Sequence, residues 1–276
     1  MSWTARLSLD YRCREGRTVL HHEHTGPLRI LKSLYPEGES VCHNVIVHPP
    51  GGLVGGDELD IRVRVDAGAH GLISTPGATR FYAADDAPAT QRVTLALEPG
   101  ARLEWLPLET IAYPGCRANN LWRAELAGHA ELLAWDVCAL GLPAAGQAFT
   151  SGHFHQRLEI PGLWLEQATM DARDTRLMDS PLGLAGQRCL GTMVLASGQA
   201  LVRERRERLL EVARDTLQAL PATVMAGATS PNPNMIVIRA VAPVVEPLMA
   251  GLQRVWASLR SAAWQLEAPA PRIWRV

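Results

Sequence analysis

The sequence lacks the features that mark several large classes of protein. Its five cysteines are odd in number, widely spaced and never part of a Cys-x-x-Cys pair; they are Cys13, Cys42, Cys116, Cys138 and Cys189. This usage argues against a disulfide framework and against a paired-cysteine zinc site. No apolar run is long enough to span a bilayer, and the N-terminus has no hydrophobic signal core. We therefore expect a reduced, cytoplasmic protein that does not bind membranes.

A charge excess of either sign is also missing. The 276 residues carry a formal net charge of −1, so the composition predicts no nucleic-acid surface. Familiar catalytic motifs are absent as well, because the sequence has neither a Gly-x-Ser-x-Gly elbow nor a His-Glu-x-x-His motif. With 47% hydrophobic residues and no linker, residues 1–276 are expected to form a single domain around a large core.

The most unusual stretch that is present joins two predicted strands. Its ten residues include two prolines, four glycines and one carboxylate; they are His48, Pro49, Pro50, Gly51, Gly52, Leu53, Val54, Gly55, Gly56 and Asp57. Because proline fixes φ and glycine admits positive φ, this composition predicts a loop with a specified path. Two interpretations of Asp57 remain open. It is either a cap held by backbone N–H groups of its own loop or a carboxylate turned into the interior.

A repeated strand–turn–strand pattern predicts the architecture. Tight turns at Gly68, Gly100 and Gly128 each separate two apolar strands, and these glycines lie 32 and then 28 residues apart. A spacing of about 30 residues is typical of stacked β-coils, although an ordinary β-sandwich also gives frequent turn signals. Apolar positions take helical spacing over residues 202–220 and 243–259. We predict a mainly β domain, a distorted β-helix or two-layer β-solenoid, with two α-helices near the C-terminus.

The proline- and glycine-rich loop resembles the signature loop of the urease accessory proteins UreD, called UreH in some organisms. Further segments match this family in the same order along the whole chain, at residues 26–28, 76–82, 103–107, 134–136 and 271–274. The chain also departs from the family pattern. Arg80 stands where the family usually has lysine, which keeps the charge but changes its geometry. Leu142 and Gln147 stand where the family has an arginine and a glutamate, so both members of that pair are missing.

This resemblance implies a function without catalysis. UreD-like proteins are not enzymes; they bind apo-urease and the accessory protein UreF, which recruits the GTPase UreG, and the complex assists GTP-dependent insertion of nickel into urease. The resemblance implies nickel in transit along a wet tunnel, with no permanently bound cofactor and no tight metal site. The positions that match polar tunnel residues of the family are Asp57, Thr79, Arg80, Asp136 and Glu166. We also predict that the two C-terminal helices face UreF, with Arg272 and Trp274 as anchors, because arginine and tryptophan are typical of interfaces.

Two rival hypotheses place other demands on the structure. A nickel-storing metallochaperone would need three or more nitrogen or sulfur ligands within ~2 Å of one metal ion, drawn from His21, His22, His24, His43 and His48. A β-helical carbohydrate-active enzyme would need Asp57 and Glu166 roughly 5–9 Å apart in an open cleft. A conduit needs only separate acids along a water-accessible interior, since oxygen ligands hold a divalent ion weakly at several stations.

Overall fold

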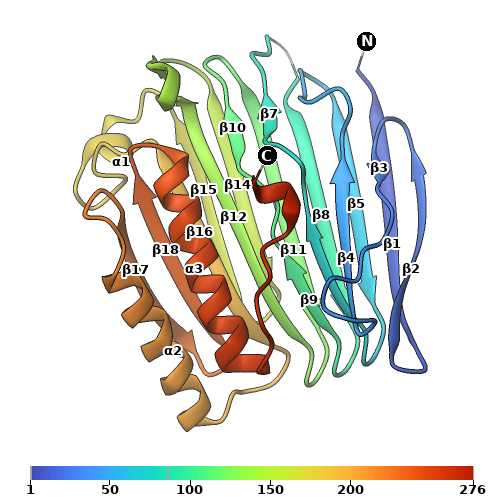
Figure 1. Cartoon of the computed structure of the whole chain (residues 1–276). Helices are drawn as coiled ribbons and strands as arrows, with labels where there is room; N and C mark the ends of the chain where they lie inside the picture. Colours follow the sequence, from blue (N-terminus) through green and yellow to red (C-terminus); the bar gives the residue numbers. More distant parts are fainter. Residues whose placement is uncertain (1, 86, 276) are drawn as a thin grey trace.

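Two β-sheets lie face to face in the computed structural model, which describes residues 2–85 and 87–275 (Figure 1). The first sheet has seven strands, in the spatial order β15 (Trp164–Asp171), β14 (His153–Ile160), β11 (Arg117–Leu126), β8 (Ala89–Leu97), β5 (Glu58–Val65), β1 (Thr4–Arg14) and β2 (Arg17–Thr25). The main path of the second sheet is β17 (Met225–Asn232), β18 (Met235–Ala242), β16 (Cys189–Ser197), β12 (Glu131–Leu142), β9 (Arg102–Trp105), β6 (His70–Ser74), β4 (Val41–Val47) and β3 (Arg29–Ile30). Three short strands complete it: β7 (Thr79–Phe81), β10 (Thr110–Ala112) and β13 (Gln147–Ala148).

The chain winds between these sheets as a β-solenoid. Successive coils pair in parallel. In the first sheet β1 pairs with β5, β5 with β8, β8 with β11 and β11 with β14; in the second sheet β4 pairs with β6, β6 with β9 and β9 with β12. Strands β7 and β10 stack against β12 as a short third face. This parallel register confirms the predicted solenoid, because the strands of an ordinary sandwich are antiparallel.

The tight turns that return each coil are equivalent but not identical. Gly68 and Gly100 both take φ of +74°, the left-handed conformation that glycine adopts without a steric penalty. In the third turn this conformation belongs to His129, with φ of +60°, and not to Gly128. The third turn position therefore lies at His129, one residue after the predicted Gly128.

Helices cover the outer face of the second sheet. The structure has the two predicted C-terminal helices, α2 (Arg203–Gln218) and α3 (Val245–Trp264), and a short α1 (Thr175–Asp179). Two short 3₁₀ turns lie at Pro143–Ala145 and Arg272–Arg275. One apolar core fills the space between the sheets, and a second lies between the second sheet and α2 and α3. Within the described residues, no helix combines the length and the apolar character that crossing a bilayer requires.

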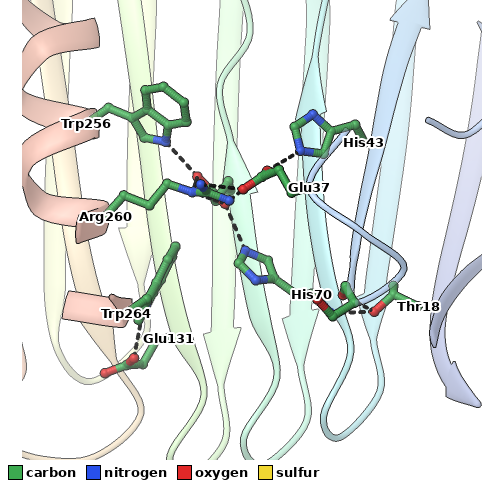
Figure 2. A network of polar contacts seen from close by, with 10 residues as sticks. Thr18, Glu37, His43, His70, Glu131, Trp256, Arg260 and Trp264 are labelled. Carbon is green, nitrogen blue, oxygen red and sulfur yellow. Dashed lines mark hydrogen bonds and ion pairs between the residues drawn. The ribbon is translucent and has the colours of Figure 1, made fainter. Parts of the chain in front are cut away.

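Buried polar groups fix α3 on the second sheet (Figure 2). Trp256, Arg260 and Trp264 lie four residues apart, so their side chains share one face of the helix. The Trp256 indole N–H donates to Glu104 (Nε1 to Oε2, 2.6 Å), and Arg260 Nε donates to the same carboxylate at 3.0 Å. Trp264 donates in the same way to Glu131 on β12 (2.6 Å). A helix face that looks apolar in sequence is therefore docked through two buried acids.

The carboxylate of Glu104 is fully buried but well compensated. Burial alone would raise its pKa, yet the hydrogen bond and charge of His70, followed by the charge of Arg260, hold that pKa below its usual value. Arg260 also donates to Glu37 (Nη2 to Oε1, 2.8 Å), and His43 Nε2 lies 2.6 Å from the same oxygen. Figure 2 shows these side chains converging from α3, β4, β6 and the loop that carries Glu37.

The C-terminal segment and the arginines of α2 make intramolecular contacts that the sequence did not indicate. Trp274 donates its indole N–H to Ser74 (Nε1 to Oγ, 2.8 Å), and its ring packs against Trp135 and Trp256 at centroid distances of 5.3 and 5.2 Å. Two arginines of α2 donate to backbone carbonyls near the end of α3: Arg205 to Ala263 and Arg208 to Ala262. Cations at a helix C-terminus stabilise it, so α2 caps α3.

Four of the five cysteines are buried, whereas Cys13 is exposed. Cys42, Cys116 and Cys138 are unpaired and have no exposed surface. Burial raises the pKa of the Cys116 thiol to about 12, so this side chain stays protonated near neutral pH and packs as a small hydrophobic group. All three cysteines therefore belong to the packed core.

Replacing Arg260 tests the docking of α3. Arg260→Met keeps the apolar stem but leaves Glu104 and Glu37 without their shared cation, and breaking a buried ion pair costs roughly 3–5 kcal/mol. We expect urea denaturation to show a loss of this size in the free energy of unfolding. The control is Arg203→Met, which removes an exposed pair with Glu207 and should change little. An Arg260→Met protein as stable as that control would contradict this account.

Candidate functional site

The signature loop follows the specified path that its composition predicts. Gly52 lies against the ring of Tyr82, and a Cβ added there would be 2.2 Å from Cε2. The loop joins the third face of the solenoid, because Leu53 donates its backbone N–H to the Arg80 carbonyl (2.7 Å) and accepts from Tyr82 (2.9 Å). Gly51 and Gly56 supply positive φ of +75° and +82°. The loop is thereby held beside residues 79–82, the second segment of family resemblance.

Asp57 serves this loop as a cap. Its side chain is 1% exposed; Oδ1 accepts from the Trp3 backbone N–H (3.2 Å) and Oδ2 from that of Val54 (2.9 Å). Of the two donors, only Val54 belongs to the loop, and Trp3 precedes β1, so Asp57 is a buried cap that joins its own loop to the start of the first sheet. A buried carboxylate whose two oxygens accept from backbone N–H groups does not suit the catalytic pair that the carbohydrate-active alternative needs.

Behind the loop, a cavity of about 230 Å³ lies between the two sheets. Its walls include five residues singled out from the sequence, which are His48, Gly51, Thr79, Arg80 and Asp136. Asp57 and Glu166 are not among them. The volume is sufficient for several water molecules. The structure therefore brings most of the predicted polar positions around one internal space.

Two buried nitrogen atoms on the wall of this cavity have no hydrogen-bond partner in the described residues. They are Nε2 of His48 and Nε1 of Trp122. Burial lowers the pKa of His48, against the opposing charge of Asp57, so its ring is neutral near pH 7. Because buried polar atoms rarely lack partners, both nitrogens indicate that the cavity is wet.

Asp136 lies at the inner end of the cavity and is held by amides. Asn120 Nδ2 donates to Oδ2 (2.8 Å), and Gln156 Nε2 donates to Oδ1 (2.5 Å). Burial raises the pKa of Asp136 to about 6, although both amide hydrogen bonds favour the charged form, and the charge of Glu166 raises the pKa further. In the part of the chain that the structure describes, this acid therefore has hydrogen-bond donors but no cation paired with it.

Beyond Asp136, a groove of about 570 Å³ opens where the first sheet ends at β15. Glu166 lies in this groove, where it accepts from Thr192 (Oγ1 to Oε1, 3.0 Å) and from Arg239 (Nε to Oε2, 2.8 Å). Gln156 lines the same groove. Its amide thus lies between Asp136 and the outer surface. Cavity, Asp136, Gln156 and groove follow one another as a polar path through the apolar core.

The histidines proposed for nickel storage are spread over separate places. His22 and His24 stack on the edge strand β2 with ring centroids 6.3 Å apart, His43 belongs to the Glu37 cluster, and His48 lines the cavity. In the described part of the chain, no group of three or more His, Cys, Asp or Glu side chains is placed to hold a metal ion. The storage hypothesis lacks the converging ligands that it requires.

Sequence reasoning missed the amides of this path. Gln91, Asn120 and Gln156 are 29 and 36 residues apart in the chain, and only the parallel register of β8, β11 and β14 places them in one row. A local signal was available. Each amide stands at an inward position of an alternating strand, as Asn120 does between Ala118 and Trp122. A polar residue in such a place must find a buried partner.

The raised pKa of Asp136 predicts that its contribution to the free energy of unfolding decreases as the pH rises. Its pKa of about 6 exceeds the ordinary 3.8, so the folded state binds this proton more tightly and loses that advantage between about pH 4 and pH 6. The shift corresponds to about 3 kcal/mol at 1.36 kcal/mol per pKa unit. Relative to wild type, Asp136→Asn should therefore gain about this much in free energy of unfolding from pH 4 to pH 7. Urea denaturation at the two pH values measures it, and a difference that does not vary with pH would refute the shift.

Known proteins match this chain over almost its whole length. The family model described as UreD urease accessory protein matches residues 4–275. A urease accessory protein UreD from Polaromonas naphthalenivorans (strain CJ2) is 57% identical over 274 residues, 99% of each chain. The UreD protein from Albidiferax ferrireducens is 58% identical over 274 residues, 99% of each chain. The one from Leptothrix cholodnii is 52% identical over 277 residues, 100% of each chain. The chain belongs to the UreD family of urease accessory proteins.

Proposed function

We propose that this protein is a non-enzymatic scaffold of urease maturation that also provides nickel with a protected path. In this proposal it binds apo-urease and UreF, recruits UreG through UreF, and assists GTP-dependent insertion of nickel into the urease active site. Membership of the UreD family supports the link to urease. The conduit rests on the polar path, and above all on Asp136.

The single observation that carries the conduit is a half-buried carboxylate on the cavity wall, Asp136, that has no counter-cation among the described residues. Asp136 is reached from the cavity on one side and, through Gln156, from the groove on the other. A negative charge in a low-dielectric interior attracts a cation strongly. Its surroundings offer amide and carboxylate oxygens, which bind divalent ions more loosely than a closed cysteine or histidine site does. Such a station suits an ion in transit.

The other residues predicted for the nickel path lie in different places and have different roles in this proposal. Thr79 and Arg80 lie at the cavity beside the signature loop, and Glu166 lies in the groove at the far end. The two charged residues, Arg80 and Glu166, therefore lie in different spaces of the proposed path, the cavity and the groove. Asp57 contributes by fixing the loop, since both of its oxygens are occupied by backbone N–H groups.

The UreF-facing surface on the C-terminal helices remains a proposal, with a changed role for one residue. Arg272 is exposed and available to a partner. Trp274 is bonded to Ser74 and packed against two other tryptophans, so its contribution would be to hold the C-terminal segment in place. Arginine at the edge of such a segment is a typical interface anchor.

Asp136 and Asp57 give opposite expectations for the same chemical change. Asp136→Asn removes the charge that attracts nickel, so activation with purified partners should deliver less nickel to urease, on the order of tenfold. Asp57→Asn keeps one capping oxygen but cannot accept from both backbone N–H groups, so it should cost some stability, while the folded variant should activate urease nearly normally. The measurement is nickel bound per urease active site at fixed time. Normal delivery by Asp136→Asn would remove the main support for the conduit.

Arg272→Ala tests the partner surface. We expect the dissociation constant for UreF to rise by roughly tenfold, the usual size of a moderate hot spot, while the unfolding midpoint stays unchanged because the side chain is exposed. A matched control is Arg173→Ala, an exposed arginine in the loop after β15. Equal affinities for the two variants would show that this surface does not bind UreF.

A further inference from the structure

A row of amide side chains crosses the inner core at the level of Asp136. Gln91 donates to Asn120 (Nε2 to Oδ1, 3.3 Å), and Asn120 and Gln156 donate to the two oxygens of Asp136. Both Asn120 and Gln156 are almost fully buried, with 1% and 3% of their surface exposed. The row is thus continuous, and it reaches the carboxylate from both neighbouring coils.

These amides stand where the two internal spaces approach each other. Asn120 and Asp136 line the cavity, whereas Gln156 lines the groove together with Thr192. A smaller pocket of about 10 Å³ between them is lined by Asp136, Trp122 and Thr192. This volume holds about one water molecule. Such a water could accept a hydrogen bond from the indole N–H of Trp122, which has no partner among the described residues.

The remaining walls of the small pocket are apolar. They include Leu158, Trp164 and Val194. An ion that met only these side chains would lose hydration without compensation, which is very costly. An amide can present its N–H groups to a carboxylate or its carbonyl oxygen to a cation, and the terminal torsion of asparagine and glutamine is soft enough to permit either.

We propose that Asn120 and Gln156 form a gate between the cavity and the groove. In the closed gate their N–H groups hold Asp136; a hydrated divalent cation at Asp136 displaces these N–H groups, and the amides turn their oxygens toward the ion as it passes. Both are positioning residues, since they act through Asp136. The proposal deepens the nickel conduit and rests on it.

Substitution of each amide by an apolar residue of similar size tests the gate. Gln156→Met and Asn120→Leu remove the donors and the oxygen, so the maximal rate of Ni²⁺ transfer to urease should fall on the order of tenfold. The nickel concentration for half-maximal rate should stay the same, because the outer ends of the path are intact. Affinity for UreF and the unfolding midpoint are measured alongside; a structural defect would change these instead.

Matched controls lie one residue away or across the hairpin. Asn119→Leu changes the neighbouring asparagine of β11, whose side chain bonds Thr90 on the other face. Gln167→Met changes a glutamine of β15 that bonds Arg157 outside the core. Both controls should transfer nickel at the wild-type rate.

The outcomes separate the gate from the conduit. Slow transfer by both amide variants, with normal controls, supports the gate. Wild-type or faster transfer by the amide variants, while Asp136→Asn is slow, overturns the gate and leaves the conduit standing. Normal transfer by all three overturns the conduit and the gate together. If Gln156→Met does not fold, Asn120→Leu decides, because it acts on the other oxygen of Asp136.

Discussion

The desolvation of carboxylates within the fold is the constraint on which this structure depends, and the chain meets it in two different ways. Outside the second sheet, Glu104 is surrounded by Arg260, His70 and Trp256, and its pKa is lowered despite full burial. Inside the solenoid, half-buried Asp136 has two neutral amides and no cation among the described residues, and desolvation raises its pKa to about 6. The first arrangement is compensated and fixes α3. The second leaves a net negative potential in a wet interior, which is what a passing cation requires.

The solenoid makes both arrangements possible because it aligns residues that are far apart in sequence. Parallel stacking places the same position of each coil in one row. Rows on the outer face of the second sheet carry Glu104 and Glu131, which receive α3, and a row on the inner face of the first sheet carries the amides that receive Asp136. The signature loop closes one end of the inner space, with Asp57 as its internal cap. Fold and proposed path therefore arise from a single geometric rule.

Much of the fold could be predicted from local patterns. Alternation, turn glycines and helical spacing are properties of neighbouring residues, and they gave the mainly β winding and both C-terminal helices. The rest depends on contacts between distant segments. His129, and not a glycine, takes the left-handed conformation of the third turn. Trp274 donates a hydrogen bond to Ser74, which lies 200 residues earlier in the sequence. The amide row has no motif at all, since it exists only in the register between coils. For Asp57, the sequence could name two roles but could not choose, because the choice depends on the N–H groups of Trp3 and Val54.

The most direct test of the account is whether nickel is sheltered during its transfer. Radioactive nickel is loaded onto the assembled complex of this protein with UreF and UreG, and transfer to apo-urease is followed with and without an excess of a strong chelator that is too large for the internal path. The account predicts that a wild-type complex delivers nickel in the presence of the chelator and that Asp136→Asn loses this protected delivery. Complete capture of the nickel by the chelator in the wild-type complex would contradict it.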